Sequence, residues 1–257
     1  MNKPASLRII YDELIQTLPE GEVISVVIGT FWTAVVINFL GETRCGLAAS
    51  LKNDDYEHAR KMAVQNPGWL NNQPAQKITR LVYSESHTET AVGLAAINAM
   101  LQLNSITAMD LHAEQYILDH AGSGNVAVVG HFPFINRIRT KLKNLWVLEL
   151  NPQEGDLLAD NAPEVLPQAD LVAITSSTLV NKTYDSIITH CRADAAKMLL
   201  GPSTPLSPLM HTFGVDVLSG TIVEDIDQVV LAVAQGANFV QLKEKGVRLV
   251  TMQRPGL

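Results

Sequence analysis

Polar side chains and glycines gather in four segments of the second half of the chain, each directly after a short apolar run. The segments span residues 130–134, 149–152, 175–183 and 201–204. The carboxyl ends of parallel strands lie at one edge of a sheet, and ligands bind in the crevice outside them. We therefore expect the four segments to converge on one site. The predicted ligand-binding residues in them are Gly130, Phe132, Glu149, Thr175, Ser176, Asn181, Thr183, Gly201, Ser203 and Thr204.

His131 is the predicted catalytic residue, because it follows the first apolar run of this half. An imidazole at that position could act as an acid, a base or a ligand near neutral pH. The alternative is a surface or core histidine with a structural role. Among the seven histidines no pair has H-E-x-x-H spacing, and neither Cys45 nor Cys191 belongs to a C-x-x-C motif. The sequence therefore predicts no metal site built from its own side chains.

Glu149 lies 19 residues after Gly130, at the end of the second predicted strand. A carboxylate at this spacing could bind the ribose hydroxyls of a nucleotide, although a surface acid at a strand end would look the same. The G-x-G-x-x-G fingerprint is absent, since His131, Phe132 and Pro133 follow Gly130. Ordinary NAD binding is thus disfavoured, while a nucleoside-like, pterin-like or other flat ligand without a diphosphate stays open.

Four residues of the first half are further candidates for ligand binding. Glu89 completes an S-x-x-E capping box with Ser86, which is a structural alternative to a role in binding. Asn98 lies in an otherwise apolar helix, where its amide needs either a backbone partner or a ligand. Trp32 and Thr33, at the turn of the first predicted hairpin, could wall the same cleft.

Two different periodicities predict the elements that position these residues. The first half contains an amphipathic helix over 7–18 and a small-residue helix from His87 that can pack closely against a sheet. After Gly122-Ser123-Gly124, short apolar strands alternate with helices, which predicts a doubly wound, mostly parallel sheet. We place an α+β domain at 1–121 and a Rossmann-like domain at 122–257. The expected strands are 23–28, 34–40 and 45–51 in an antiparallel meander, then 126–129, 145–150, 171–174, 197–200, 215–218 and 247–251, and a further helix is expected around 56–64.

Composition excludes several classes of protein. The 257 residues are 47% apolar and 18% charged, as in packed globular proteins. The net charge of −7, without a long Lys/Arg run, argues against nucleic-acid binding. No apolar run reaches the length of a membrane span, and the start lacks a signal-peptide core, so we expect a cytoplasmic protein with no membrane partner. We also expect a homo-oligomer, with a homodimer as the simplest form.

Taken together, several stretches resemble a known family, the heavy-metal chelation domain family, whose function is not established. The resemblance implies a domain like the N-terminal domain of enolases, followed by a Rossmann-like domain, with a site between them. It also implies roles in heavy-metal chelation, or in condensation or hydrolysis during synthesis of flavins, pterins or siderophore-like chelators. The matching stretches are 29–35, 46–48, 89–99, 129–133, Glu149 with Pro152 and Gly155-Asp156, 175–183 and 201–205.

Three functions remain open from the sequence. The first is an enzyme that condenses or hydrolyses a small pterin, flavin or siderophore-like metabolite, with His131 as general acid/base. In it, Glu149 would hold hydroxyls or a ring nitrogen, and Asn181, Ser203 and Thr204 would orient polar groups. The second is a binding protein for a metal chelate, without turnover. The third is an S-adenosylmethionine-dependent methyltransferase. The expected partner is a small molecule, such as a metal chelator, and no cofactor is assigned.

Overall fold

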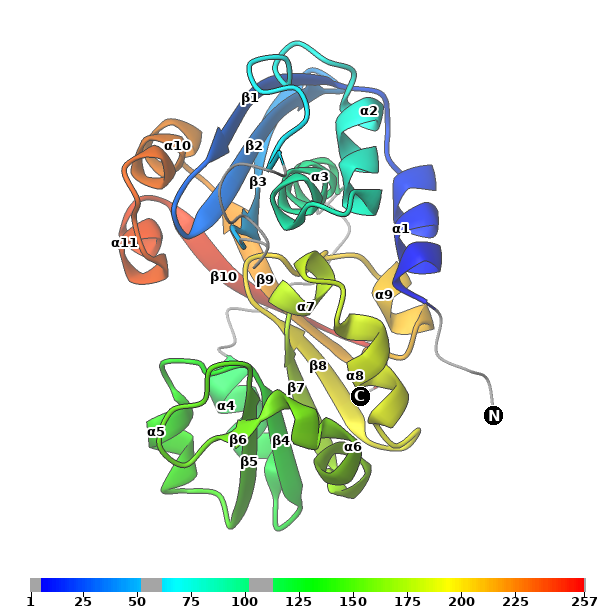
Figure 1. Cartoon of the computed structure of the whole chain (residues 1–257), viewed down its shortest axis with the longest axis vertical. Helices are drawn as coiled ribbons and strands as arrows, with labels where there is room; N and C mark the ends of the chain where they lie inside the picture. Colours follow the sequence, from blue (N-terminus) through cyan, green and yellow to red (C-terminus); the bar gives the residue numbers. More distant parts are fainter. Residues whose placement is uncertain (1–5, 52–61, 102–112, 257) are drawn as a thin grey trace.

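The computed structural model describes residues 6–51, 62–101 and 113–256, and these form two sheets (Figure 1). A three-stranded antiparallel sheet lies at one end of the molecule, and a seven-stranded, mostly parallel sheet lies at the other. The predicted fold class, a small α+β unit followed by a Rossmann-like sheet, is confirmed. In the described part of the chain, no helix is long and apolar enough to cross a membrane.

The first sheet is the predicted meander, with neighbouring strands in the order β1-β2-β3. Its connections are short, so each strand pairs with the next along the chain. The predicted helix over 56–64 falls mostly outside the described residues, and 62–64 are not helical. The elements of this half are α1 (Leu7–Gln16), β1 (Glu22–Ile28), β2 (Trp32–Phe39), β3 (Glu42–Ala49), α2 (Ala75–Thr79), the 3-10 helix η2 (Arg80–Tyr83) and α3 (His87–Met100).

Helix α3 packs closely against β3, as its small residues predict. The close approach occurs at Gly46, where a Cβ atom would lie 2.1 Å from the carbonyl oxygen of Ala95 and 2.3 Å from the amide nitrogen of Ala99. A side chain at this position would therefore push the helix off the sheet. Ser86 caps α3 by accepting a hydrogen bond from the Glu89 amide, which confirms this half of the capping box.

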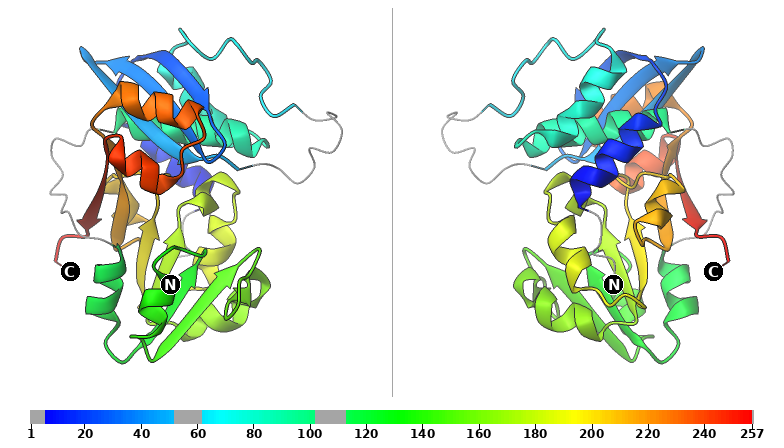
Figure 2. Two further views of the ribbon diagram at one scale, coloured as in Figure 1. Left: turned by 90° about the vertical axis from the view of Figure 1, so that its left-hand side faces the viewer. Right: turned by 90° about the vertical axis from the view of Figure 1, so that its right-hand side faces the viewer.

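The opposite face of the same sheet is covered by the end of the chain. Two helices, α10 (Ile226–Ala234) and α11 (Phe239–Glu244), lie beside the blue strands in Figure 2. Ala34 and Val36 of β2 form a buried cluster with Val229 and Val233 of α10. The second half of the chain therefore completes the core of the first, and the boundary near 121 stays a prediction.

The second sheet places β4 between β7 and β5, which makes the β4/β7 boundary the topological switch point. All its neighbouring strands are parallel except β10, which runs antiparallel to β9. The strands, in sheet order, are β10 (Val247–Gln253), β9 (Val217–Val223), β8 (Ala196–Leu200), β7 (Leu171–Thr175), β4 (Asn125–Val129), β5 (Asn144–Glu149) and β6 (Leu157–Leu158). The helices flanking it are α4 (Ala113–Ala121), α5 (Ile135–Arg139), α6 (Ala162–Val165), α7 (Ser177–Val180), α8 (Tyr184–His190) and α9 (Leu209–Thr212), with 3-10 turns η4 (Ala159–Asn161) and η5 (Leu166–Gln168).

Candidate functional site at the carboxyl edge of the parallel sheet

The four predicted loops lie at one edge of the second sheet, where α7 approaches α3 and β3 (Figure 1). Two glycines bring neighbouring loops together. A Cβ atom on Gly130 would lie 3.0 Å from the Cβ of Thr175, and one on Gly201 would lie 2.8 Å from the hydroxyl of Ser176. Both glycines have positive φ, 100° and 120°, which a residue with a side chain rarely adopts. We call this group of loops the carboxyl edge.

Glu149 joins the loop after β5 to the loop after β4. Its Oε2 accepts a hydrogen bond of 2.8 Å from the backbone amide of His131, and its Oε1 accepts one of 2.9 Å from the amide of Leu150. The carboxylate therefore fixes the two loops relative to each other. Its predicted role toward ligand hydroxyls stays a prediction.

His131 is held by a buried carboxylate. Its Nδ1 lies 2.7 Å from Oδ2 of Asp156, whose side chain is completely buried, and Arg139 contacts the other oxygen of Asp156 at 2.8 Å. An ionised carboxylate can only accept hydrogen bonds, so the proton of this pair belongs on Nδ1. A neutral imidazole with this tautomer carries its lone pair on Nε2.

The Nε2 atom of His131 is the chemically available end of this arrangement. The side chain is 15% exposed, and none of the described residues hydrogen-bonds to Nε2. A histidine oriented by a buried carboxylate through Nδ1 is the geometry of a general base or of an oriented ligand. The dyad of His131 and Asp156 thus gives the carboxyl edge one group that can take or supply a proton.

Asp156 and Arg139 were missing from the predicted site. Asp156 lies in the loop before the two-residue strand β6, which has too little periodicity to be recognised. The only signal for it was its presence in the stretch Gly155-Asp156 of the family resemblance. Arg139 carries no signal, because a basic residue at the end of a helix is ordinarily a surface residue.

The carboxyl edge also contacts the first sheet directly. The hydroxyl of Ser203 accepts a hydrogen bond of 2.8 Å from the backbone amide of Ala49, and the Asn98 amide group donates to the carbonyl of Leu47 at 3.0 Å. A longer contact of 3.5 Å joins the same Asn98 nitrogen to the carbonyl of Pro202. Asn98 therefore bridges β3 and the loop after β8.

Two buried polar atoms at this interface have no hydrogen-bond partner among the described residues. They are Oδ1 of Asn98 and Oγ1 of Thr204. Buried polar atoms are normally satisfied, and leaving one unpaired costs about 1–3 kcal/mol. A hydrogen-bonding molecule beside them would remove that cost. We call Asn98, Ser203 and Thr204 the interface cluster.

Three predicted residues of the first half lie outside the carboxyl edge. Trp32 faces the opposite side of the first sheet, where its ring packs against Phe239 with ring centroids 5.6 Å apart. The hydroxyl of Thr33 pairs with that of Ser50 at 2.9 Å. Glu89 accepts a hydrogen bond of 2.8 Å from the amide of Gln65 and lines a separate pocket. The structure thus does not bring Trp32 or Glu89 to the predicted cleft.

Three predicted residues of the second half have local partners. Oδ1 of Asn181 accepts hydrogen bonds from the amide of Thr183 at 3.2 Å and from its hydroxyl at 2.7 Å. This turn leads into α8, whose N-cap residue Thr183 makes no side-chain capping hydrogen bond, so the two side chains pair with each other. The ring of Phe132 stacks on Phe134, with centroids 5.3 Å apart.

Within residues 6–51, 62–101 and 113–256, the potential metal-binding side chains do not gather into one site. No group of three or more His, Cys, Asp or Glu side chains with suitable geometry occurs among the described residues. Burial raises the pKa of Cys45 to about 12 and that of Cys191 to about 11, so both remain protonated thiols at neutral pH. Metal binding by thiols needs the thiolate.

Comparison with known proteins places this architecture among related chains. A protein of Methanocaldococcus jannaschii, described as uncharacterized, is 26% identical over 207 residues, which is 78% of each chain. A crystal structure from Desulfitobacterium hafniense shares 28% identity, covers 96% of this chain and 98% of its own, and has a TM-score of 0.79. One from Pyrococcus horikoshii shares 19% identity, covers 96% and 99%, and has a TM-score of 0.81.

Both crystal structures are described as proteins of unknown function from the DUF364 family. The DUF364 family model, with the description "Putative heavy-metal chelation", matches residues 113–252 of this chain, and the DUF4213 model, with the same description, matches residues 11–101. The first match alone spans more than half of the sequence, so the protein belongs to the DUF364 family.

Proposed function

We propose that this protein binds a small organic molecule, such as a metal chelator, at the carboxyl edge and exchanges a proton with it through His131. The observation that carries the proposal is the pairing of His131 Nδ1 with buried Asp156, which is itself paired with Arg139. This pairing leaves Nε2 as the group that meets the ligand. A fixed imidazole of this kind is suited to general acid–base chemistry.

The interface cluster supports binding of an organic molecule at the same edge. The β4, β7 and β8 loops are neighbours, and adjacent strands lie about 4.8 Å apart. The strands that lead to His131 and Thr204 are therefore about 10 Å apart, a span that one molecule of a few rings can cover. Such a molecule would donate a hydrogen bond to Oδ1 of Asn98 and pair with the hydroxyl of Thr204.

The family description is compatible with a chelator as the ligand. A metal ion bound by side chains alone would need several donors, whereas the carboxyl edge offers the single Nε2 of His131 besides carboxylates that already accept hydrogen bonds. A chelated ion brings its own donors. We infer that any metal enters this site as part of such a complex.

Native mass spectrometry of gently purified protein, repeated after denaturation, tests the proposal. We expect an organic mass that is bound to the wild type, is released on unfolding and is retained less by Thr204→Val. A metal adduct that survives desalting with no organic mass would contradict the proposal. Absence of any bound mass, together with failure of a pterin and of riboflavin to shift the melting temperature, would also contradict it.

A binding protein without turnover is the second candidate. It is favoured by the surroundings of His131, since the hydrogen bonds described for this residue lead to Glu149 and Asp156 and to no nucleophilic side chain. Once a ligand is known, His131→Gln separates the two. An enzyme would lose most of its turnover while still binding, whereas a binding protein would show only a change in affinity.

A further inference from the structure

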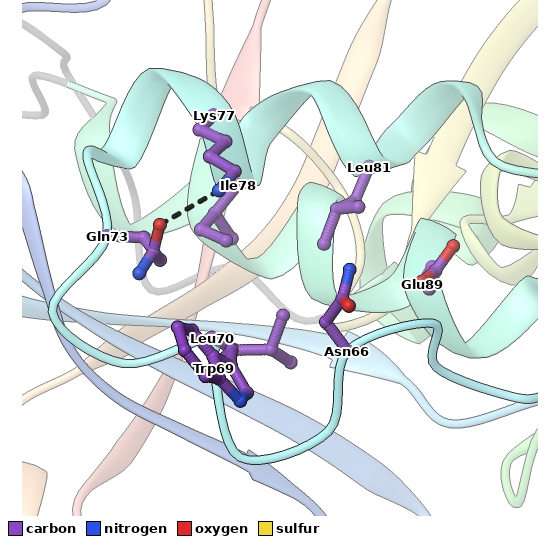
Figure 3. A pocket seen from close by; sticks show the side chains of 8 residues that line it. All are labelled: Asn66, Trp69, Leu70, Gln73, Lys77, Ile78, Leu81 and Glu89. Carbon is purple, nitrogen blue, oxygen red and sulfur yellow. Dashed lines mark hydrogen bonds between the residues drawn. The ribbon is translucent and has the colours of Figure 1, made fainter.

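A second pocket lies in the first half of the molecule, between α2 and the segment 66–73 that precedes it (Figure 3). It has a volume of about 240 Å³, and none of its lining residues belongs to the carboxyl edge. Its middle is apolar, with Leu70, Ile78 and Leu81 contributing side chains, and the indole of Trp69 lies along one wall.

The wall that carries Trp69 is fixed in place. The amide of Asn72 donates to the carbonyl of Val23 at 2.7 Å, and the amide of Val23 donates to the carbonyl of Gln73 at 2.9 Å. These bonds attach the segment to β1. Trp69 nevertheless stays 74% exposed, although a large aromatic side chain gains free energy when it is covered. A preformed wall with an exposed indole is suited to receiving a flat molecule.

The two ends of the pocket carry opposite charges. Figure 3 shows Gln73 and Lys77 at one end and Glu89 at the other. The ammonium of Lys77 lies 2.9 Å from Oε1 of Gln73, which keeps it near the mouth. Glu89 is 5% exposed, and its two oxygens accept hydrogen bonds from the Gln65 amide and the Ser84 hydroxyl. Each oxygen keeps a further lone pair for another donor.

We propose that this pocket binds a small zwitterion with a flat apolar body. Its ammonium group pairs with the carboxylate of Glu89, its carboxylate pairs with Lys77, and its ring lies against Trp69. The pocket is smaller than the roughly 300–1,000 Å³ typical of drug-sized ligands, which limits the body to about one ring. This proposal is independent of the function proposed for the carboxyl edge.

Isothermal titration calorimetry of the full chain with 4-(aminomethyl)benzoate tests this proposal. Benzoate, which carries only the carboxylate, and benzylamine, which carries only the ammonium group, are the control ligands. We expect the zwitterion to bind at least tenfold more tightly than either control ligand. Trp69→Ala should abolish binding, and the exposed position of Trp69 makes this variant safe for folding. Lys77→Met should reduce the affinity for the zwitterion to that for benzylamine, and it should leave the affinity for benzylamine unchanged.

His131→Gln serves as the control, because it lies at the other site and should leave all three affinities unchanged. Equal affinities for the zwitterion and the control ligands would overturn the proposal. The proposal would also be overturned if Trp69→Ala bound the zwitterion as tightly as the wild type, or if His131→Gln changed any of the three affinities. The same holds if no heat of binding is seen at a 10-fold molar excess of ligand in the millimolar range.

Discussion

The surroundings of His131 and the interface cluster share one sheet edge but satisfy their polar groups in opposite ways. Around His131, the backbone amide and Nδ1 each pair with a carboxylate, those of Glu149 and Asp156, and Asp156 pairs in turn with Arg139. In the interface cluster, Ser203 has a backbone partner while Oγ1 of Thr204 has none among the described residues. In our proposal the first region exchanges a proton with the ligand. The second links the two sheets, and its unpaired atoms are proposed to meet the same ligand.

This comparison predicts that substitutions near the interface cluster act on stability, whereas substitutions at His131 act on the ligand. Gly46→Val should have the largest effect. Its side chain would collide with the backbone of α3 at Ala95, and we expect a loss of about 4 kcal/mol or more in the free energy of unfolding. Urea denaturation measures this loss, with exposed Thr43→Val on the same strand as the control. Equal stability of the two variants would refute the close packing.

Ser203→Ala and Thr204→Val form a matched pair of neighbouring buried hydroxyls, 1% and 2% exposed. Removing the Ser203 hydroxyl leaves the amide of Ala49 unpaired and should cost about 1–3 kcal/mol. Replacing the unpaired hydroxyl of Thr204 by a methyl group removes an unsatisfied buried polar group, so it should raise the free energy of unfolding of ligand-free protein by up to about 1–3 kcal/mol. Urea titrations of both variants test this, and a reversed order would break the comparison.

The pKa of Cys45 predicts an effect on the strand that carries Gly46 that is confined to alkaline pH. Burial raises this pKa from about 9 to about 12. Between these two pH values the thiol is protonated in the folded protein and releases its proton on unfolding. Stability from this residue is complete below pH 9 and is lost as the pH rises toward 12. Relative to Cys45→Ala, the wild type should lose at most about 1.4 kcal/mol per pH unit in this range. Parallel slopes for the two proteins in alkaline urea titrations would contradict the prediction.

The smallest effect on stability is expected for His131→Gln. Asp156 keeps its hydrogen bonds from Arg139 and the Gln153 amide in this variant, so the free energy of unfolding should change by less than about 1 kcal/mol. The same variant should retain less of the bound organic mass than the wild type. A large loss of stability with unchanged ligand retention would reassign His131 to a structural role.

Local patterns predicted most of the elements of this fold. The strands of the first sheet and the capped helix at His87 follow from short connections and a capping box. The convergence of Gly130, Thr175 and Gly201 followed from the topology of parallel strands alone. These inferences need no knowledge of contacts between distant residues.

Contacts between distant segments could not be predicted in this way. Trp32 lies on the sheet face covered by α11, more than 200 residues later in the chain. The alternation of side chains along β2 separates the two faces of the sheet, but it does not say which element covers each face. Asp156 escaped prediction because its partner is 25 residues away and no periodic element surrounds it. Isolated polar residues in loops become a site only through tertiary structure.

The most direct test of the central claim is a long-range ¹H–¹⁵N NMR spectrum of the His131 imidazole, assigned with His131→Gln. At a pH where the imidazole is neutral, we expect the tautomer with its proton on Nδ1 and an Nε2 signal that shifts when the released ligand is added back. Asp156→Asn should redistribute the tautomers, because an amide can donate to Nδ1 as well as accept from it. At this pH, a proton on Nε2 in the wild type, or an Nε2 signal that does not respond to the ligand, would contradict the account.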